Sequence, residues 1–142
     1  MGNQVKMDKT IHIVDDDAAV RDALGVVFML EGFHVKGFEN GVEFLAAARD
    51  NPPSCVVLDV HMPGRSGLDI LRELNAHHYP TPIFIISGQG DIPMAVQAIK
   101  NGAFDFIEKP FDAETVLARV KEAIAAAERR ASHSDGIGVV FP

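Results

Sequence analysis

The chain has 142 residues, enough for one domain with a substantial hydrophobic core and too few for two domains of ordinary size. Hydrophobic residues make up 47% of the chain and charged residues 23%, which is typical of globular proteins and excludes a disordered chain. The net charge of −7 argues against a nucleic-acid-binding surface within these residues, because such surfaces are rich in lysine and arginine.

Cysteine content and hydropathy bear on the cellular compartment. The one cysteine, Cys55, allows neither an intramolecular disulfide nor a cysteine-based zinc site, which fits a reducing compartment. No apolar stretch approaches the roughly 18 residues that span a bilayer, and residues 1–9 lack the apolar region of a signal peptide. We therefore expect a cytoplasmic protein without a membrane contact.

Short apolar runs alternate five times with amphipathic segments, a pattern typical of βαβ units in a parallel sheet. The expected strands are residues 10–14, 33–38, 55–58, 83–86 and 103–107. The expected helices are residues 18–30, capped by Asp17, residues 42–49 and residues 67–75. A fourth is capped by Asp91 and ends at residue 100, and a longer one is capped by Asp112. The alternation of polar and apolar residues in the second strand suits a sheet edge. The pattern predicts an α/β fold with one five-stranded sheet.

Composition divides the chain into three parts. Residues 10–128 contain all the expected strands and helices and form the expected domain. Residues 1–9 are expected to be an N-terminal extension. Residues 129–142, which are mostly small and polar, are expected to be a tail or the start of an interdomain linker.

Polar residues follow the expected strands at their carboxyl ends, where ligands bind in open parallel sheets. Residues 15–17, all aspartate, follow the first strand, and Asp59, Ser87 and Lys109 follow the third, fourth and fifth. Carboxylates from two adjacent strand ends would repel one another. A hard divalent cation such as Mg²⁺ would neutralise them, and its coordination shell is commonly completed by a phosphate.

These residue types fit phosphoryl transfer. Lys109 can hold a phosphoryl group as a point charge, and Ser87 can donate a hydrogen bond to it from the neighbouring strand. Asp59 is the best candidate nucleophile, because an aspartate can accept a phosphoryl group as an acyl phosphate.

Four segments, taken in order, resemble the receiver domain of two-component response regulators over about residues 10–127. They read VDD at 14–16, LDVHMPG at 58–64, SG at 87–88 and IEKPF at 107–111. Residues 87–96 and 102–111 are most similar to FixJ-type and NtrC-type receivers, which drive transcription. The resemblance implies a flavodoxin-like (CheY-like) doubly wound parallel sheet, with strand order 2-1-3-4-5 and helices on both faces.

The resemblance also implies the chemistry of the site. Asp59 would take a phosphoryl group from a sensor histidine kinase. Asp16, Asp59 and the backbone carbonyl of His61 would hold Mg²⁺, with Asp15 assisting through water. Such a domain catalyses its own phosphorylation and is a switch rather than a turnover enzyme.

The resemblance gives further residues a role in the response to phosphate. Ser87 and Lys109 would contact the phosphoryl oxygens, and Phe106 would turn inward when Ser87 moves. The Lys109–Pro110 peptide bond would be cis. The side chains of His61 and Gln89 are candidates for tuning hydrolysis of the acyl phosphate, against the simpler interpretation that they are ordinary loop residues.

Phosphorylation would then shift an equilibrium on the face formed by the fourth helix, the fifth strand and the last helix. The expected output is homodimerisation or contact with a transcriptional output module. DNA would be bound only through an output domain that these residues do not contain.

Three alternatives compete with this interpretation. A phosphatase of the haloacid-dehalogenase kind needs a second acid two residues after the nucleophile, where His61 stands. A flavodoxin-like cofactor domain needs a phosphate-binding loop after the first strand, where this chain has carboxylates. A receiver-like interaction module that takes no phosphate is the remaining alternative, and the presence of Asp59, the acidic pair and Lys109 argues against it.

Overall fold

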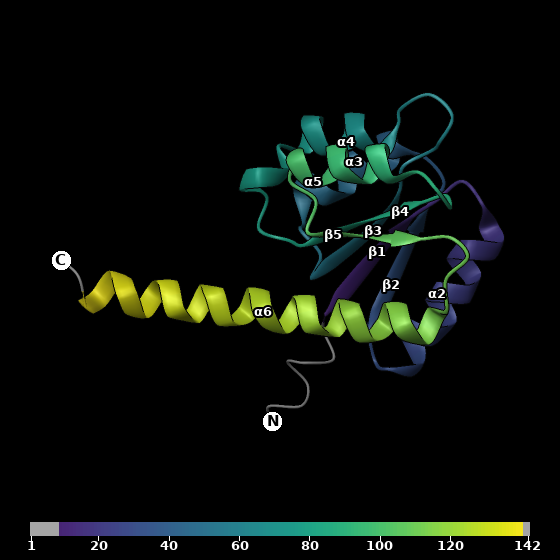
Figure 1. The fold of residues 1–142 in the computed structure, drawn as a ribbon. Coiled ribbons are helices and arrows are strands. Elements are labelled where there is room, and N and C mark those ends of the chain that lie inside the picture. Colours follow the sequence, from purple (N-terminus) through teal and green to yellow (C-terminus); the bar gives the residue numbers. More distant parts are fainter. Residues whose placement is uncertain (1–8, 141–142) are drawn as a thin grey trace.

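The computed structural model describes residues 9–140, with side chains described for residues 9–131. It contains one parallel sheet in the order β2-β1-β3-β4-β5 (Figure 1). Its strands are β1 (Thr10–Val14), β2 (His34–Phe38), β3 (Cys55–Asp59), β4 (Ile83–Ser87) and β5 (Asp105–Glu108). The predicted fold class and strand order are therefore confirmed.

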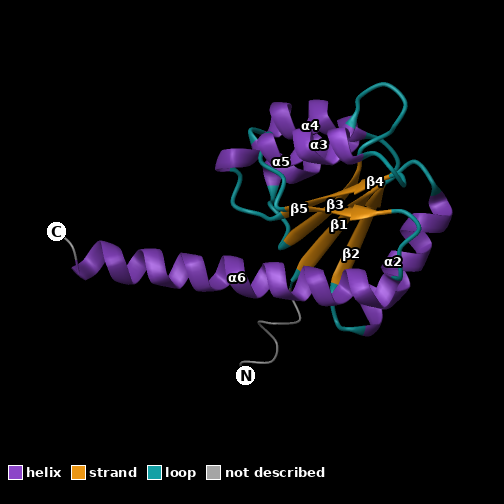
Figure 2. Cartoon of the chain, in the orientation of Figure 1, coloured by secondary structure: helices purple, strands orange, loops and turns teal. Residues whose placement is uncertain are grey.

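Helices cover both faces of the sheet, as Figure 2 shows. The helices are α2 (Ala18–Leu30), α3 (Gly41–Asp50), α4 (Gly67–Leu74), α5 (Ile92–Lys100) and α6 (Ala113–Val140), with a short 3₁₀ helix η1 (Ala76–His78). Helices α2 and α6 lie on one face, and α3, α4 and α5 lie on the other. No helix in the described residues is both long enough and apolar enough to cross a membrane.

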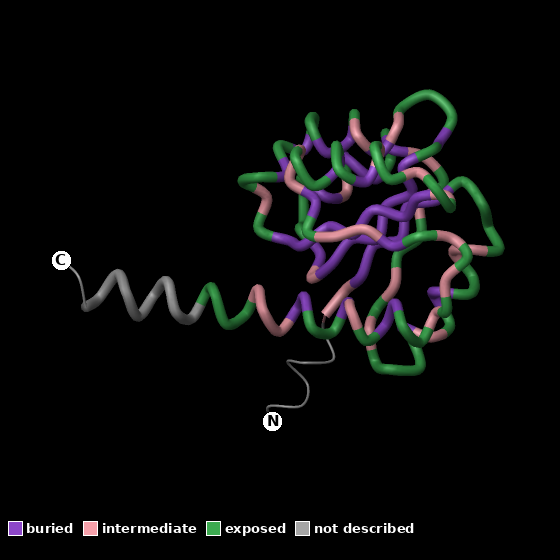
Figure 3. The backbone as a smooth tube through the Cα atoms, in the orientation of Figure 1, coloured by how far each residue is buried: buried purple, intermediate pink, exposed green. Residues whose placement is uncertain are grey.

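The core consists of two apolar layers, one on each side of the sheet. Figure 3 shows that the buried residues concentrate in the central strands between them. Every residue of β3 and β4 is buried, because each of these strands has neighbours on both sides and helices above and below. Strand β2 is mostly exposed, which confirms that it is an edge strand. Burial of both faces explains why the central strands read as continuous apolar runs.

Most predicted boundaries agree with the structure to within a residue or two, and the start of β5 shows why one does not. Residue 103 was predicted to be in this strand, but the strand begins at Asp105. Gly102 adopts a positive φ of 102°, and the N–H of Ala103 donates to the carbonyl of Ala98. Residues 102–103 therefore close the end of α5 before the chain can join the sheet.

Two of the three predicted aspartate caps are confirmed. The carboxylate of Asp17 accepts from the N–H of Ala19, and that of Asp112 accepts from the N–H of Thr115. The prediction for Asp91 is wrong, because its side chain makes no hydrogen bond to the first turn of α5.

The last helix extends well past the sheet (Figure 1). Its backbone continues as a helix through residues 129–140, the segment predicted to be a tail or the start of a linker. The domain boundaries stay predictions. Residues 1–8 of the predicted extension and residues 141–142 lie outside the described part of the chain.

One buried polar side chain stands out in the core. His12 of β1 is 2% exposed and packs edge-on against the rings of Phe38 and Phe44, and its Nδ1 has no hydrogen-bond partner. Burial, and then the charge of Lys36, lower the pKa of His12 to about 4. The imidazole is therefore neutral in the folded protein at neutral pH.

This histidine should make the fold sensitive to acid. Between pH 6.5 and about 4 the unfolded chain takes up a proton that the folded protein excludes, so the free energy of unfolding falls as pH falls. Between pH 7 and pH 5, we expect the free energy of unfolding of His12→Leu to fall by about 2 kcal/mol less than that of the unsubstituted protein. Urea unfolding measures both values. The exposed His34→Leu is the control. Equal losses in the His12 variant and the unsubstituted protein would contradict the assignment.

Candidate functional site

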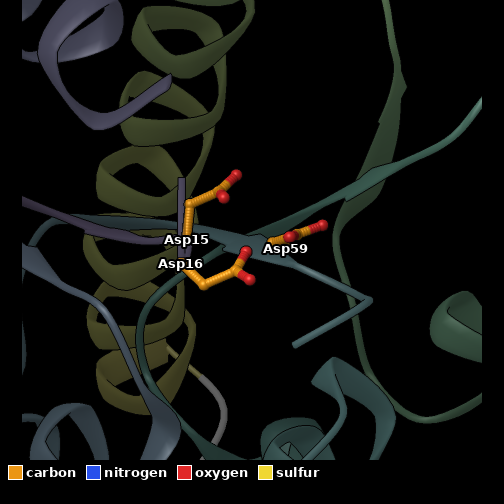
Figure 4. A group of neighbouring side chains, drawn as sticks. All are labelled: Asp15, Asp16 and Asp59. Atoms are coloured by element: carbon orange, nitrogen blue, oxygen red, sulfur yellow. The ribbon is translucent and has the colours of Figure 1, made fainter. Parts of the chain in front are cut away.

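Three aspartates converge where β1 and β3 end side by side. Asp15 follows β1 directly, and Asp59 is the last residue of β3, the neighbouring strand. One carboxylate oxygen from each of Asp15, Asp16 and Asp59 lies within 4.8 Å of the others (Figure 4). Asp15 is fully buried and Asp59 is 4% exposed, whereas Asp16 faces solvent.

Backbone groups hold the two buried carboxylates in place. The N–H of Asp17 donates to Oδ1 of Asp15 over 2.9 Å, and the N–H of His61 donates to Oδ1 of Asp59 over 3.4 Å. The guanidinium of Arg21 donates to the backbone carbonyl of Asp15. The second oxygen of Asp15, Oδ2, is buried without a hydrogen-bond partner. Such an oxygen is costly to bury unless a further group binds it.

Lys109 brings a positive charge to the same place from the end of β5. Its Nζ lies 3.7 Å from Oδ2 of Asp15 and 3.9 Å from Oδ1 of Asp59. Its backbone N–H donates to the carbonyl of Ser87 at the end of β4, and its peptide bond to Pro110 is cis. One ammonium beside three carboxylate groups leaves the cluster with excess negative charge.

The burial and the excess charge raise the carboxyl pKa values. Desolvation, and then the neighbouring Asp15, raise the pKa of Asp59 to about 6, against the opposing effects of Lys109 and the His61 N–H. Desolvation also raises the pKa of Asp15, and the Asp17 N–H and Lys109 oppose that shift. The cluster therefore has a strong tendency to bind a proton or a cation.

The donor set fits Mg²⁺. Carboxylate oxygens are the ligands that this hard cation prefers, and it commonly binds one or two carboxylates and keeps several waters. A cation beside Asp15, Asp16 and Asp59 would also satisfy the orphaned oxygen of Asp15. The cluster is therefore a candidate Mg²⁺ site.

The remaining predicted residues lie around this cluster at different depths. Ser87 is buried at the end of β4, and Phe106 is half-buried on β5, paired in register with Ile85 and packed against the core beneath α3 to α5. Gln89 is exposed in the loop after β4.

The His61 side chain takes part in a contact that the sequence did not predict. Its Nε2 lies 2.7 Å from Oδ2 of Asp91. Thirty positions separate the two residues, and the sequence carries no signal that joins them.

Comparisons with known proteins agree with this site and fold. Residues 11–121 match the family model for the response regulator receiver domain. The chain is 44% identical over 118 residues to the transcriptional regulatory protein FixJ of Bradyrhizobium diazoefficiens. This match covers 83% of the chain and 58% of FixJ.

Solved structures give the same result. A crystal structure of NtrX from Brucella abortus matches with a TM-score of 0.83 and 35% identity, over 90% of this chain and 29% of NtrX. A solution structure described as the beryllofluoride-activated NtrC4 receiver domain dimer matches with a TM-score of 0.77 and 29% identity, over 83% of this chain and 98% of that one.

The fold and the acidic site define a receiver domain of a two-component system. The chain belongs to the family of response regulator receiver domains and is not a turnover enzyme. Its curated relatives include transcriptional regulatory proteins, and the chain spans about three fifths of their length.

The repulsion in the acidic cluster should be measurable as stability. In a metal chelator at pH 7.5, we expect Asp59→Asn to have a free energy of unfolding higher by about 1–3 kcal/mol, because it removes a buried charge. This difference should shrink as pH falls through about 6. There Asp59 takes up a proton in the folded protein before it does in the unfolded chain, so the free energy of unfolding of the unsubstituted protein rises.

Denaturant unfolding at pH 7.5 and pH 5 tests this expectation. The exposed Asp50→Asn, which makes the same change in charge, should shift stability little. A destabilised Asp59→Asn at pH 7.5 would show that the three carboxylates do not repel as described.

Proposed function

We propose that this chain is a phospho-accepting signalling switch, in which Asp59 takes a phosphoryl group from a sensor histidine kinase in the presence of Mg²⁺. The observation that carries the proposal is the position of the Asp59 carboxylate, held between the acidic pair Asp15 and Asp16 and the ammonium of Lys109. Membership of the receiver family supports the same function.

The residues of the cluster would bind the cation in two ways, directly and through water. Asp16, Asp59 and the backbone carbonyl of His61 would hold the cation directly, and Asp15 would assist through a water molecule. When bound, Mg²⁺ would neutralise the carboxylates and the phosphoryl oxygens, so that two negatively charged groups can approach. Without that neutralisation the negative charge of the three carboxylates would repel an approaching phosphate.

In the transfer step an oxygen of Asp59 forms a bond to phosphorus. The bond from phosphorus to the histidine nitrogen of the kinase breaks, and its electron pair stays on that nitrogen. Lys109 and Ser87 would stabilise the charge on the phosphoryl oxygens. The hydrogen bond between their backbones, 2.8 Å from the Lys109 nitrogen to the Ser87 oxygen, supports this joint role because it fixes their spacing.

The response to phosphorylation would begin at Ser87. Movement of its hydroxyl toward the phosphoryl group would free space near the half-buried ring of Phe106, on the adjacent strand, and that ring would turn inward. His61 and Gln89, which flank the site from two loops, would tune the rate of hydrolysis. The equilibrium between two arrangements of α5, β5 and α6 would thereby shift.

An exposed apolar strip supports a homodimer as the output. Ile92, Val96 and Ile99 of α5 are 53%, 46% and 40% exposed, and Phe104 just before β5 is 43% exposed. The spacing of the three α5 residues places them on one side of the helix, and contiguous exposed apolar surface is typical of interaction sites. DNA binding would belong to an output module outside these residues, as the transcriptional relatives suggest.

Mass spectrometry tests the phosphorylation directly. We expect a single phosphoryl adduct after incubation with Mg²⁺ and acetyl phosphate, and none for Asp59→Asn or in the presence of a chelator. Asp50→Asn, with the same change in charge at an exposed position, should be phosphorylated as fully as the unsubstituted protein. A folded protein that binds Mg²⁺ and takes no adduct would favour the phosphorylation-independent interaction module.

The dimer has its own test. In size-exclusion chromatography with light scattering, we expect the phosphorylated protein to be dimeric and phosphorylated Val96→Glu to be monomeric, because a charge in the strip opposes its burial. Val26→Glu on α2 is the matched control, since Val26 is similarly exposed and α2 packs on the other face of the sheet. Equal dimerisation of the Val96 and Val26 variants would exclude the strip as the interface.

A further inference from the structure

The loops that follow β3 and β4 are joined by one side-chain contact. Nε2 of His61, in the loop after β3, lies 2.7 Å from Oδ2 of Asp91, in the loop after β4. A carboxylate only accepts hydrogen bonds at neutral pH, so Nε2 must carry the proton and donate it. We name this pair the clasp.

The backbone presents Asp91 to the clasp. The N–H of Asp91 donates to the carbonyl of Gly88 over 3.2 Å, and Gly90 has a positive φ of 82°. On the opposite side of this turn, the N–H of Gly90 donates to the carboxylate of Glu108 at the end of β5. The turn after β4 is thereby held between β5 on one side and the loop after β3 on the other.

Among the described residues, the Asp91 carboxylate makes a hydrogen bond or ion pair with His61 alone. It occupies the position before α5 where an aspartate usually caps the helix, yet it makes no hydrogen bond to the first turn. The clasp therefore forms in place of a cap, and removal of the carboxylate takes no capping hydrogen bond from α5.

The clasp lies beside the phosphoacceptor. His61 stands two residues after Asp59, and its backbone N–H donates to Oδ1 of Asp59. Ser87, four residues before Asp91, ends the adjacent strand. Asp59 is only 4% exposed, and a phosphodonor has to reach its carboxylate, so separation of the two loops beside it would widen the access.

From this geometry we infer that the clasp restricts access to Asp59, with Asp91 as the positioning residue that holds His61 against the loop after β4. The inference rests on the proposed phosphorylation of Asp59. Opening the clasp would let the two loops separate, and both a phosphodonor and water would then reach the site more readily.

An access role makes a specific kinetic prediction. Loss of the clasp should raise the rate constant for phosphorylation by acetyl phosphate and the rate constant for hydrolysis of the acyl phosphate together. The expected increase in each is about two- to fivefold, the range for loss of one partly exposed charged contact. A role of His61 in hydrolysis alone would change only the second rate constant.

The experiment compares Asp91→Ala, His61→Ala and the double variant with the unsubstituted protein, following intact mass over time during phosphorylation and after removal of the donor. Asp91→Ala should accelerate both reactions, and it should have no further effect when His61 is already alanine. Asp91→Asn keeps an oxygen that can accept from Nε2, so its rates should lie close to those of the unsubstituted protein. Asp50→Ala, an exposed aspartate at the end of α3, controls for the change in charge.

Nitrogen NMR of the His61 ring gives a readout independent of turnover. The clasp predicts the tautomer protonated at Nε2 in the unsubstituted protein and in Asp91→Asn, and a change in the ring signals in Asp91→Ala. Thermal unfolding of each variant identifies any loss of fold, and His61→Ala breaks the same contact from the other side if Asp91→Ala is unstable.

Unchanged rates in Asp91→Ala, or the same acceleration with and without His61, would overturn the inference and leave the proposed function standing. No adduct on the unsubstituted protein would overturn both. An acceleration of hydrolysis without an acceleration of phosphorylation would also overturn the access role.

Discussion

Three carboxylates held within 4.8 Å of one another repel strongly, and two of them are buried. At an effective dielectric constant of about 20, each pair of charges at this distance costs on the order of 3 kcal/mol. The ammonium of Lys109 offsets part of this cost, but desolvation and then the charge of Asp15 still raise the pKa of Asp59 to about 6. The fold thus keeps uncompensated negative charge at one edge of the sheet, and the proposed cation and phosphoryl chemistry follow from that charge.

The rest of the structure holds these charged residues in place. Buried central strands fix the positions of Asp15 and Asp59, and the β4–β5 pairing brings Ser87 and Lys109 to the same edge. Helix α4 begins so close to the end of β3 that a Cβ on Gly67 would lie 2.8 Å from the backbone oxygen of Asp59. Glycine is required there for space, and this close approach leaves the end of β3 little freedom to relax away from the repulsion.

Local patterns and one geometric rule were enough to predict the α/β fold class and the convergence of Asp15, Asp59 and Lys109, whereas the strand order came from the resemblance to receiver domains. Apolar runs and helical spacing predicted the strands and helices, and parallel strands carry their terminal residues to a common edge. Contacts between distant loops leave no such pattern. The cap expected of Asp91 was wrong because His61, thirty positions away, lies close enough to take its carboxylate. The continuation of α6 to Val140 was missed because small and polar residues favour helix only weakly.

Titration calorimetry with Mg²⁺ tests the electrostatic account most directly. We predict one saturable site on the unsubstituted protein, with binding lost in Asp59→Asn and in Asp16→Asn and retained in Asp50→Asn. Binding should weaken as pH falls below about 6, because protons then compete for Asp59. A protein that is folded and binds no Mg²⁺ at millimolar concentration, or that binds it equally well without Asp59, would contradict the account.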